Sequence, residues 1–165
     1  MLLHTLSPRL APLIEYLDSL TGPADLKTLT RLLRSVEVTR HDLGESVHFL
    51  TDGYARNRVA ITDWYELVTL CWRAGQSSCI HDHAGAACAF RVIEGTGYEQ
   101  RYAKREDGLV EPTTARVLPQ GHLCAAWDTD IHQIVNRSGC DLITLHIYTP
   151  PLDKWNTYQT AGEPS

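Results

Sequence analysis

The sequence predicts one mainly β domain, a sandwich or barrel with helices packed on its outside. From about residue 47 onwards, short apolar runs alternate with turn signals such as Glu94-Gly95 and Ser138-Gly139. Before that point, apolar residues recur at helical spacing instead. We therefore expect a single domain over residues 1–165. Residues 1–46 would form a helical N-terminal cover, and residues 47–165 the β structure and a C-terminal tail.

Two helices are expected in the N-terminal cover. Ser7-Pro8 is typical of a helix start, because serine caps the first turn and proline fits its first position. Leucine and isoleucine residues then follow at helical spacing until Thr21-Gly22-Pro23 stops the helix. A second helix is expected over residues 24–35, where leucines gather on one face.

The β part contains ten candidate strands, each bounded by turn residues. Their ranges are 47–50, 56–61, 65–73, 78–83, 86–94, 97–104, 114–118, 123–126, 131–136 and 141–148. The residues after Tyr148 are expected to be irregular. We find no internal repeat, linker or second domain in the sequence.

Composition narrows the functional classes. Of the 165 residues, 43% are hydrophobic and 21% charged, and the net charge is −5 without a basic run. This argues against nucleic acid or an anionic membrane as partner. No apolar segment approaches the roughly 20 residues of a membrane span, and the N-terminus lacks a signal-peptide pattern. We expect a cytoplasmic monomer whose five cysteines, without a CxxC pair, form neither a disulfide framework nor a thiolate zinc site.

The segment with the clearest chemical content is His81-Asp82-His83. Residues two apart on a strand project from the same face, so both imidazoles could meet one metal ion while Asp82 points away. Imidazole is a ligand for iron, copper, nickel and zinc. An isolated His-x-His pair can equally be two half-buried histidines on a strand.

The surroundings of this pair resemble the two motifs of the cupin superfamily. Gly75 precedes His81 and Gly95 closes the first segment. A second segment has Pro119-Gln120-Gly121, then His132 and Asn136. The resemblance implies a cupin, jelly-roll-like β-barrel in which His81, His83 and His132 bind one metal ion.

One position departs from the general cupin pattern. A glutamate ligand usually follows the histidine pair, and Cys88 stands in its place here. Three neutral imidazoles would leave a dipositive metal its full charge, which favours an anionic outside ligand such as a thiolate.

Further segments narrow the resemblance to the thiol dioxygenases, and to the cysteine dioxygenase family in particular. They are Leu70-Cys71-Trp72, Ser78-Cys79-Ile80-His81-Asp82-His83, Tyr54-Ala55-Arg56-Asn57 and Leu145-His146-Ile147-Tyr148-Thr149-Pro150-Pro151. The resemblance implies ferrous iron on three histidines, and a small thiol oxidised by O2 to a sulfinic acid.

The resemblance also assigns a substrate-binding group. Arg56 would bind the substrate carboxylate, for which its planar, permanently charged guanidinium is suited. Tyr54 and Tyr148 would contribute hydroxyl groups to substrate binding. Without the resemblance, Arg56 would be read as one half of a surface salt bridge.

Thr144, His146 and Tyr148 alternate along the last predicted strand and so share one face. The resemblance implies a hydrogen-bonded row outside the metal that directs the tyrosine hydroxyl toward it, with Thr144 in place of the family's serine. The residues alone would be read as a buried polar stripe, or His146 as a metal ligand.

Cys88 matches the cysteine that forms a thioether with the active-site tyrosine in some family members. The resemblance thus implies a Cys88–Tyr148 cross-link, whereas a free core cysteine is the alternative. Trp155 and Ala87 stand where some relatives have a cysteine and a histidine, so the entrance to the site is expected to differ.

Taken together, the resemblance implies an iron(II) dioxygenase of cysteine catabolism that converts L-cysteine to cysteine sulfinic acid. Its catalytic residues would be Tyr148, His146, Arg56 and Cys88. Three alternatives stay open: a dioxygenase for 3-mercaptopropionate or cysteamine, a metal-binding cupin without turnover, and an isomerase or hydrolase cupin using zinc or manganese. The last would more naturally retain a carboxylate ligand.

Overall fold

The computed structural model describes residues 7–127 and 130–162. The helical elements are the 3₁₀ turn η2 (Pro8–Leu10), α1 (Ala11–Asp18), α2 (Leu26–Ser35) and the 3₁₀ turn η3 (His41–Ser46). The strands are β1 (Ala55–Ile61), β2 (Glu66–Trp72), β3 (Ile80–His81), β4 (Ala87–Glu94), β5 (Gly97–Lys104), β6 (Val110–Leu118), β7 (Leu123–Trp127), β8 (Ile131–Val135), β9 (Leu142–Thr149) and β10 (Thr157–Tyr158).

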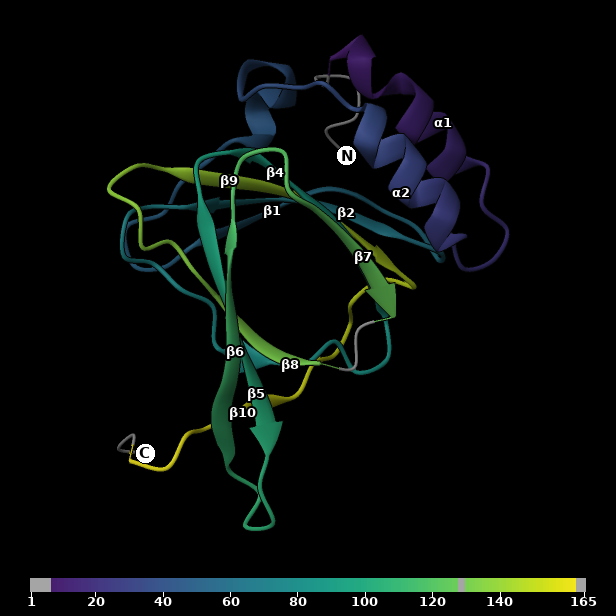
Figure 1. Ribbon diagram of the computed structural model, residues 1–165. Helices are drawn as coiled ribbons and strands as arrows, with labels where there is room; N and C mark the ends of the chain where they lie inside the picture. The colour runs from purple at the N-terminus through teal and green to yellow at the C-terminus, as the bar shows by residue number, and fades with distance from the viewer. Residues whose placement is uncertain (1–6, 128–129, 163–165) are drawn as a thin grey trace.

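The strands form two antiparallel five-stranded sheets that face each other. The first sheet has the order β1-β2-β9-β4-β7 and the second the order β10-β3-β8-β5-β6. Figure 1 shows α1 and α2 beside the first sheet, on the side away from the second. The prediction of a mainly β fold with helices packed outside is confirmed. The division at residue 46 stays a prediction.

The two strands β2 and β9 in the interior of the first sheet are buried on both faces. Every residue of β2 and β9 is buried. On the outer face, Leu67 and Ile147 pack with helix residues such as Leu13 and Leu29. On the inner face, alternate residues of the same strands pack against the second sheet, as Leu70 does in one cluster with Ile134. This double burial explains why these strands read as continuous apolar runs in the sequence.

Two helices lie where the sequence predicts, although α1 ends at Asp18, before the predicted stop, and α2 begins two residues after the predicted start. The Ser7 hydroxyl accepts a hydrogen bond from the Arg9 backbone, with Pro8 at the first position of the turn. Asp25 caps α2 by accepting from the Thr28 backbone at 2.8 Å. Both caps satisfy backbone N–H groups that the first turn leaves without partners.

The predicted strand at 47–50 is wrong, since these described residues form no strand. Their backbone carbonyls bond to side chains instead: Asn57 Nδ2 donates to His48 and Gln76 Nε2 to Leu50. The guanidinium carbons of Arg40 and Arg73 lie 5.3 and 4.6 Å from the centre of the Phe49 ring. Side-chain partners therefore replace the expected ladder.

The strand predicted over 78–83 is shorter than expected and ends at His81. Asp82 directs the chain out of the strand, because its carboxylate accepts from the Ala84 backbone at 2.9 Å. The segment then turns through Ala84 and Gly85, both with positive φ. His83 consequently lies beyond the strand that was expected to carry it.

The predictions for the residues of β6 and β10 were also inaccurate. β6 begins four residues before the predicted start, and Pro112 within it obscured the strand pattern. Proline is tolerated there because β6 is an edge strand. The tail expected to be irregular contributes β10, which pairs with β3.

Gly95 forms the close turn between β4 and β5 that the sequence predicts. Its φ is +82°, and a Cβ there would lie 2.3 Å from the Asp141 carbonyl oxygen. Only glycine accommodates both the dihedral angle and this backbone approach.

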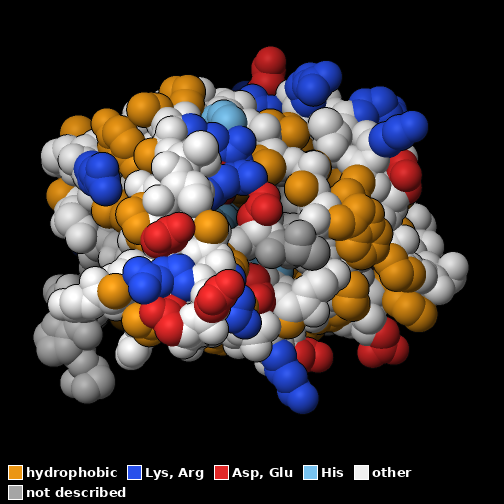
Figure 2. All heavy atoms as spheres, turned by 60° about the horizontal axis from the view of Figure 1, so that its bottom comes forward, with side chains coloured by type: hydrophobic (Ala, Val, Ile, Leu, Met, Phe, Trp, Pro, Cys, Tyr) orange, Lys and Arg blue, Asp and Glu red, His pale blue; other side chains and the backbone are white. Residues whose placement is uncertain are grey.

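Within the described residues, none of the helices is both long and apolar enough to span a bilayer. On the face drawn in Figure 2, basic and acidic side chains are intermingled.

Candidate metal centre

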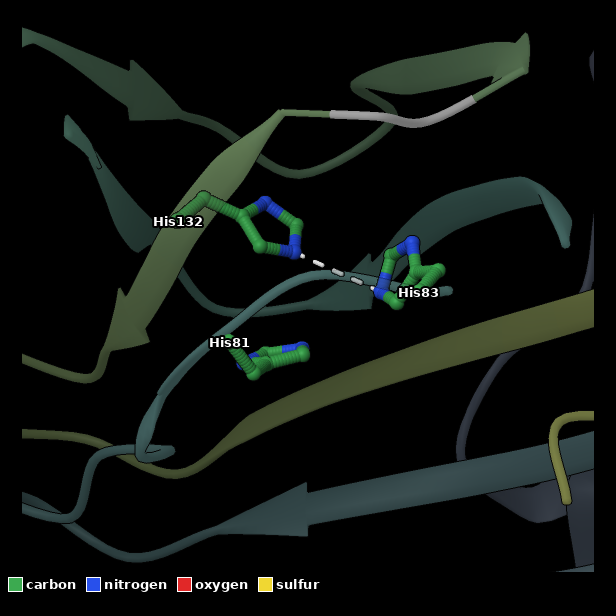
Figure 3. A group of neighbouring side chains, drawn as sticks. All are labelled: His81, His83 and His132. Atoms are coloured by element: carbon green, nitrogen blue, oxygen red, sulfur yellow. Dashed lines mark hydrogen bonds between the residues drawn. The ribbon is translucent and has the colours of Figure 1, made fainter. Parts of the chain in front are cut away.

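Three histidines converge between the sheets. His81 is the last residue of β3 and pairs with His132 of β8, and His83 follows two residues later. The ligand atoms of all three lie within 4.8 Å of one another. Figure 3 shows the three rings turned toward a common space. The same-face argument for His81 and His83 reached this arrangement, although only His81 is in the strand.

Hydrogen bonds on Nδ1 hold two of these rings in place. His81 Nδ1 lies 2.9 Å from the Cys79 carbonyl oxygen, and His132 Nδ1 lies 2.9 Å from Glu99 Oε1. A carbonyl or carboxylate oxygen only accepts, so both Nδ1 atoms carry the proton. Nε2 is then the atom available to a metal, and Nε2 of His132 lies 3.4 Å from Nε2 of His83.

Glu99 is a buried carboxylate behind His132, and the sequence analysis missed it. It lies on β5, 2% exposed, and Arg116 and Arg101 donate to its Oε2. Burial by itself raises the pKa of Glu99, but hydrogen bonds from His132 and Arg116 outweigh it and lower the pKa to about 2. A carboxylate in this position fixes a ligating imidazole and raises its basicity.

A cavity adjoins the three histidines. It is lined by eight of the nine predicted site residues, namely Tyr54, Arg56, His81, His83, Cys88, His132, His146 and Tyr148. Thr144 stands behind them and bonds to His146. The cavity wall also includes Trp72, Cys79, Phe90, Leu152 and Trp155.

The inner face of β9 carries a hydrogen-bonded row. Trp72 Nε1 donates to Thr144 Oγ1 at 3.3 Å, Thr144 Oγ1 lies 2.9 Å from His146 Nε2, and the Tyr148 hydroxyl lies 3.4 Å from His146 Nδ1. The His146 ring also stacks on Phe90, with centroids 4.9 Å apart. Burial lowers the pKa of His146 well below its ordinary value, so the ring is neutral.

Tyr148 lies between the histidines and Cys88. Its ring meets His83 edge to face at 5.4 Å between centroids, and Cys88 is its direct partner across β4 and β9. The Cys88 sulfur lies 3.8 Å from His146 Nδ1. Burial, and secondarily the neighbouring Cys88, raise the pKa of Tyr148 well above its ordinary value, so the hydroxyl keeps its proton.

Arg56 enters the cavity from β1. Its Cζ lies 5.6 Å from the centre of the Tyr148 ring. Nη1 and Nη2 donate to the two carboxylate oxygens of Glu66 at 2.8 and 2.6 Å. Tyr54 stacks on Trp72 with centroids 4.1 Å apart. Arg56 and Tyr54, two of the three residues expected to bind substrate, thus flank the same cavity as Tyr148. Glu66 is a partner of Arg56 that the sequence did not reveal.

Asp82 points away from the histidines, as expected, and binds the C-terminal segment. Its carboxylate accepts from the Asn156 side chain, at 3.0 Å for Oδ2, and from the Tyr158 hydroxyl at 2.7 Å. Trp155 immediately precedes this anchor and lines the cavity. The residue between two candidate metal ligands therefore also holds part of the cavity wall.

Comparison with known proteins agrees with this site. The profile of the family described as cysteine dioxygenase type I matches residues 5–161. The chain belongs to the cysteine dioxygenase type I family. Human cysteine dioxygenase type 1 is 27% identical over 164 residues, which covers 94% of this chain and 82% of that protein. The Danio rerio protein of the same name is 26% identical over 141 residues, covering 81% of this chain and 70% of that protein.

Solved structures support the fold of this cysteine dioxygenase family member. A Klebsiella pneumoniae protein with a double-stranded beta-helix domain matches with a TM-score of 0.57 and 19% identity, covering 70% of this chain and 88% of that chain. Oxalate decarboxylase from Bacillus subtilis matches with a TM-score of 0.52 and 14% identity, over 66% of this chain and 28% of that chain. The cupin, or double-stranded β-helix, fold is confirmed.

Trp72, Glu66 and Glu99 were not predicted as parts of the site, and the sequence contains a different signal for each kind of residue. Trp72 lies within a segment quoted for the family resemblance but received no role. Glu66 and Glu99 interrupt otherwise apolar or alternating strand patterns, and a buried carboxylate of this kind requires a partner. Glu66 meets Arg56 on the neighbouring strand, and Glu99 meets Arg116 and His132, 17 and 33 residues away, so strand pairing brings these partners together.

Proposed function

We propose that the protein is an iron(II) dioxygenase that converts the thiol of L-cysteine to a sulfinic acid. The observation that carries this proposal is the convergence of three histidines on a cavity walled by Arg56 and Tyr148. Membership of the cysteine dioxygenase type I family supports it. The reaction balances without a further reductant, because one thiol and one O2 yield one sulfinic acid.

His81, His83 and His132 would hold the iron through Nε2. Imidazole nitrogens suit ferrous iron, and the set contains three neutral donors without a carboxylate. Bound iron would supply a binding site for the thiolate and for O2. It would also supply the electron transfer that makes O2 reactive. The remaining work falls to the protein, which must bind, orient and shield the thiol.

Arg56 and Tyr54 would hold the carboxylate of the substrate at one wall of the cavity. Arginine binds carboxylates with parallel charge-assisted hydrogen bonds. Fixing the carboxylate restricts the thiol to one orientation relative to the histidines, and orientation of this kind is a large part of catalysis.

Tyr148 would donate a hydrogen bond toward the reacting atoms. Its raised pKa keeps the hydroxyl protonated, and the row formed by Trp72, Thr144 and His146 limits where the phenol can move. Such a preorganised donor stabilises negative charge that develops on oxygen. The stacked Phe90 adds apolar surface on the same wall.

The test is an oxygen-uptake assay with iron-loaded protein and three thiols: L-cysteine, 3-mercaptopropionate and cysteamine. We expect L-cysteine to have the highest kcat/KM, with one O2 consumed for each sulfinic acid formed. A higher kcat/KM for either other thiol would reassign the substrate. If none of the three thiols caused oxygen uptake, the dioxygenase function would be contradicted and a metal-binding cupin without turnover would be favoured.

A further inference from the structure

The Arg56 guanidinium is already engaged by a carboxylate of the protein itself. Nη1 and Nη2 each donate to one oxygen of Glu66, the end-on bidentate arrangement. Arginine carries five N–H donors. Two are given to Glu66, which leaves Nε–H and one N–H on each terminal nitrogen. A substrate carboxylate would therefore have to bind through donors that Glu66 does not use.

Glu66 is placed to hold this arrangement rigidly. It is wholly buried at the start of β2, with Tyr148 as its direct partner on β9. Arg58 Nε donates to the same carboxylate at 2.7 Å. Burial by itself raises the pKa of Glu66, but hydrogen bonds from the two arginines outweigh it and the pKa is lowered. Glu66 is thus a buried anion with three charge-assisted bonds.

The charges of Arg56, Arg58 and Glu66 do not cancel. Two arginines and one glutamate sum to a single positive charge, and Arg56 is the member that lines the cavity. Arg58 is not among the described residues of the cavity wall, and its side chain is 53% exposed. The cavity wall therefore keeps one positive charge that attracts a carboxylate, while the bonds to Glu66 restrict the movement of the Arg56 side chain.

We propose that Glu66 is the positioning residue for carboxylate-bearing thiols: it fixes the Arg56 guanidinium so that its remaining donors face the cavity. A long side chain held in its binding conformation loses less entropy when ligand arrives. Glu66 acts through Arg56 and does not itself touch the substrate. The inference rests on the thiol oxidation proposed above.

The test compares Glu66→Gln with the native protein, both iron-loaded, on the same three thiols. We expect KM for L-cysteine and 3-mercaptopropionate to rise about tenfold, because glutamine cannot accept both arms of the guanidinium. We expect kcat, and the KM of cysteamine, to stay within about twofold of the native values. Anaerobic titration of each thiol, followed by tryptophan fluorescence, should give the same pattern without turnover.

Two further variants separate geometry from charge and from general damage. Glu94→Gln breaks another bidentate pair, in which Arg40 donates through Nε and Nη2 at 3.1 and 2.7 Å, and Glu94 is not among the described cavity residues. It should leave all three KM values unchanged. The double variant Glu66→Gln/Arg58→Gln restores the single positive charge and should still show the raised KM. It also carries the test should Glu66→Gln alone not fold.

Three results would overturn the inference. A lower KM for L-cysteine in Glu66→Gln would mean that Glu66 competes with the substrate for Arg56. An equal rise for cysteamine would mean general damage to the cavity. Native KM values in the double variant would mean that charge alone matters. Native protein that oxidises none of the thiols would instead contradict the proposed function, while anaerobic binding would still report on Glu66.

Discussion

Glu99 Oε1 lies 2.9 Å from Nδ1 of His132, and both side chains are buried between the sheets. This contact sets which nitrogen of His132 carries the proton and so which one faces His81 and His83. It lies on the opposite side of the ring from the candidate metal site.

Replacing Glu99 should therefore weaken metal binding. In Glu99→Gln we expect about 10- to 100-fold lower affinity for ferrous iron, measured by competition with a chelator, because the imidazole loses a carboxylate partner. Glu111→Gln is the matched control, since Glu111 is an exposed glutamate of the same sheet. Unchanged affinity in Glu99→Gln would show that the contact does not support the ligand.

The ligand assignment distinguishes His132 from His146. His132→Ala should abolish stoichiometric iron, because it removes one of three converging nitrogen atoms. His146→Ala should retain iron and lose activity, because both nitrogens of His146 lie near Thr144 and Tyr148. Metal analysis after anaerobic loading decides the matter. Iron kept by His132→Ala and lost by His146→Ala would reverse the assignment.

Arg56 should separate thiols with a carboxylate from those without one. For Arg56→Gln we expect a loss in kcat/KM for L-cysteine of roughly two orders of magnitude, or about 2–3 kcal/mol, as a charge-assisted bidentate contact disappears. Cysteamine, which has no carboxylate, should lose much less. Steady-state oxygen uptake measures both losses, and equal losses would rule out carboxylate binding by Arg56.

Cys88 and Tyr148 should become covalently joined during turnover. They are direct neighbours across two strands, and in the iron-loaded protein O2 would take one hydrogen from the Cys88 thiol and one from the Tyr148 ring, becoming H2O2, as the thioether forms. Peptide mapping should find a joined Cys88–Tyr148 peptide lighter by two hydrogens, in an amount that grows with turnover. Cys79, which also lines the cavity, is the internal control and should stay open to alkylation. Full alkylation of Cys88 after many turnovers would identify it as a plain core cysteine.

Asp82 should control the order of the C-terminal segment. In Asp82→Asn the bond from the Tyr158 hydroxyl is lost or weakened, so we expect amide exchange around residues 156–158 to speed up by about tenfold. Hydrogen–deuterium exchange measures this directly. Asp153→Asn, an exposed change in the same segment, should leave exchange there unaltered, and equal protection in both variants would remove the anchoring role.

The sequence was most informative where local patterns decide the structure. The helix cap at Ser7, the turn at Gly95 and the alternation along β9 could all be predicted because each depends on neighbours in the chain. The strand at 47–50 was wrong because Asn57 and Gln76, from other segments, occupy its backbone acceptors. Local propensity contains no information about such partners.

The candidate site was likewise predictable where local motifs define it and unpredictable where residues meet only in the folded structure. Motifs were enough to bring His81, His83 and His132 together as candidates. The carboxylates that partner the site residues were not predictable, because Glu99 on β5 meets His132 on the neighbouring β8, and Glu66 on β2 meets Arg56 on the neighbouring β1, only once the strands have paired. The length of β3 was misjudged for a local reason, since the Asp82 carboxylate accepts from the Ala84 backbone and directs the chain out of the strand.

The two sheets contribute different parts of the candidate site. His81 and His132 belong to the second sheet, whereas Arg56 lies on β1, the edge strand of the first, with a single neighbouring strand. An edge strand tolerates substitution more readily than a central one, because fewer contacts must be rebuilt. The wall proposed to bind the substrate carboxylate can thus diverge, or be redesigned, while the candidate metal centre stays the same. Variation at β1 offers a route to new thiol preferences within one unchanged scaffold.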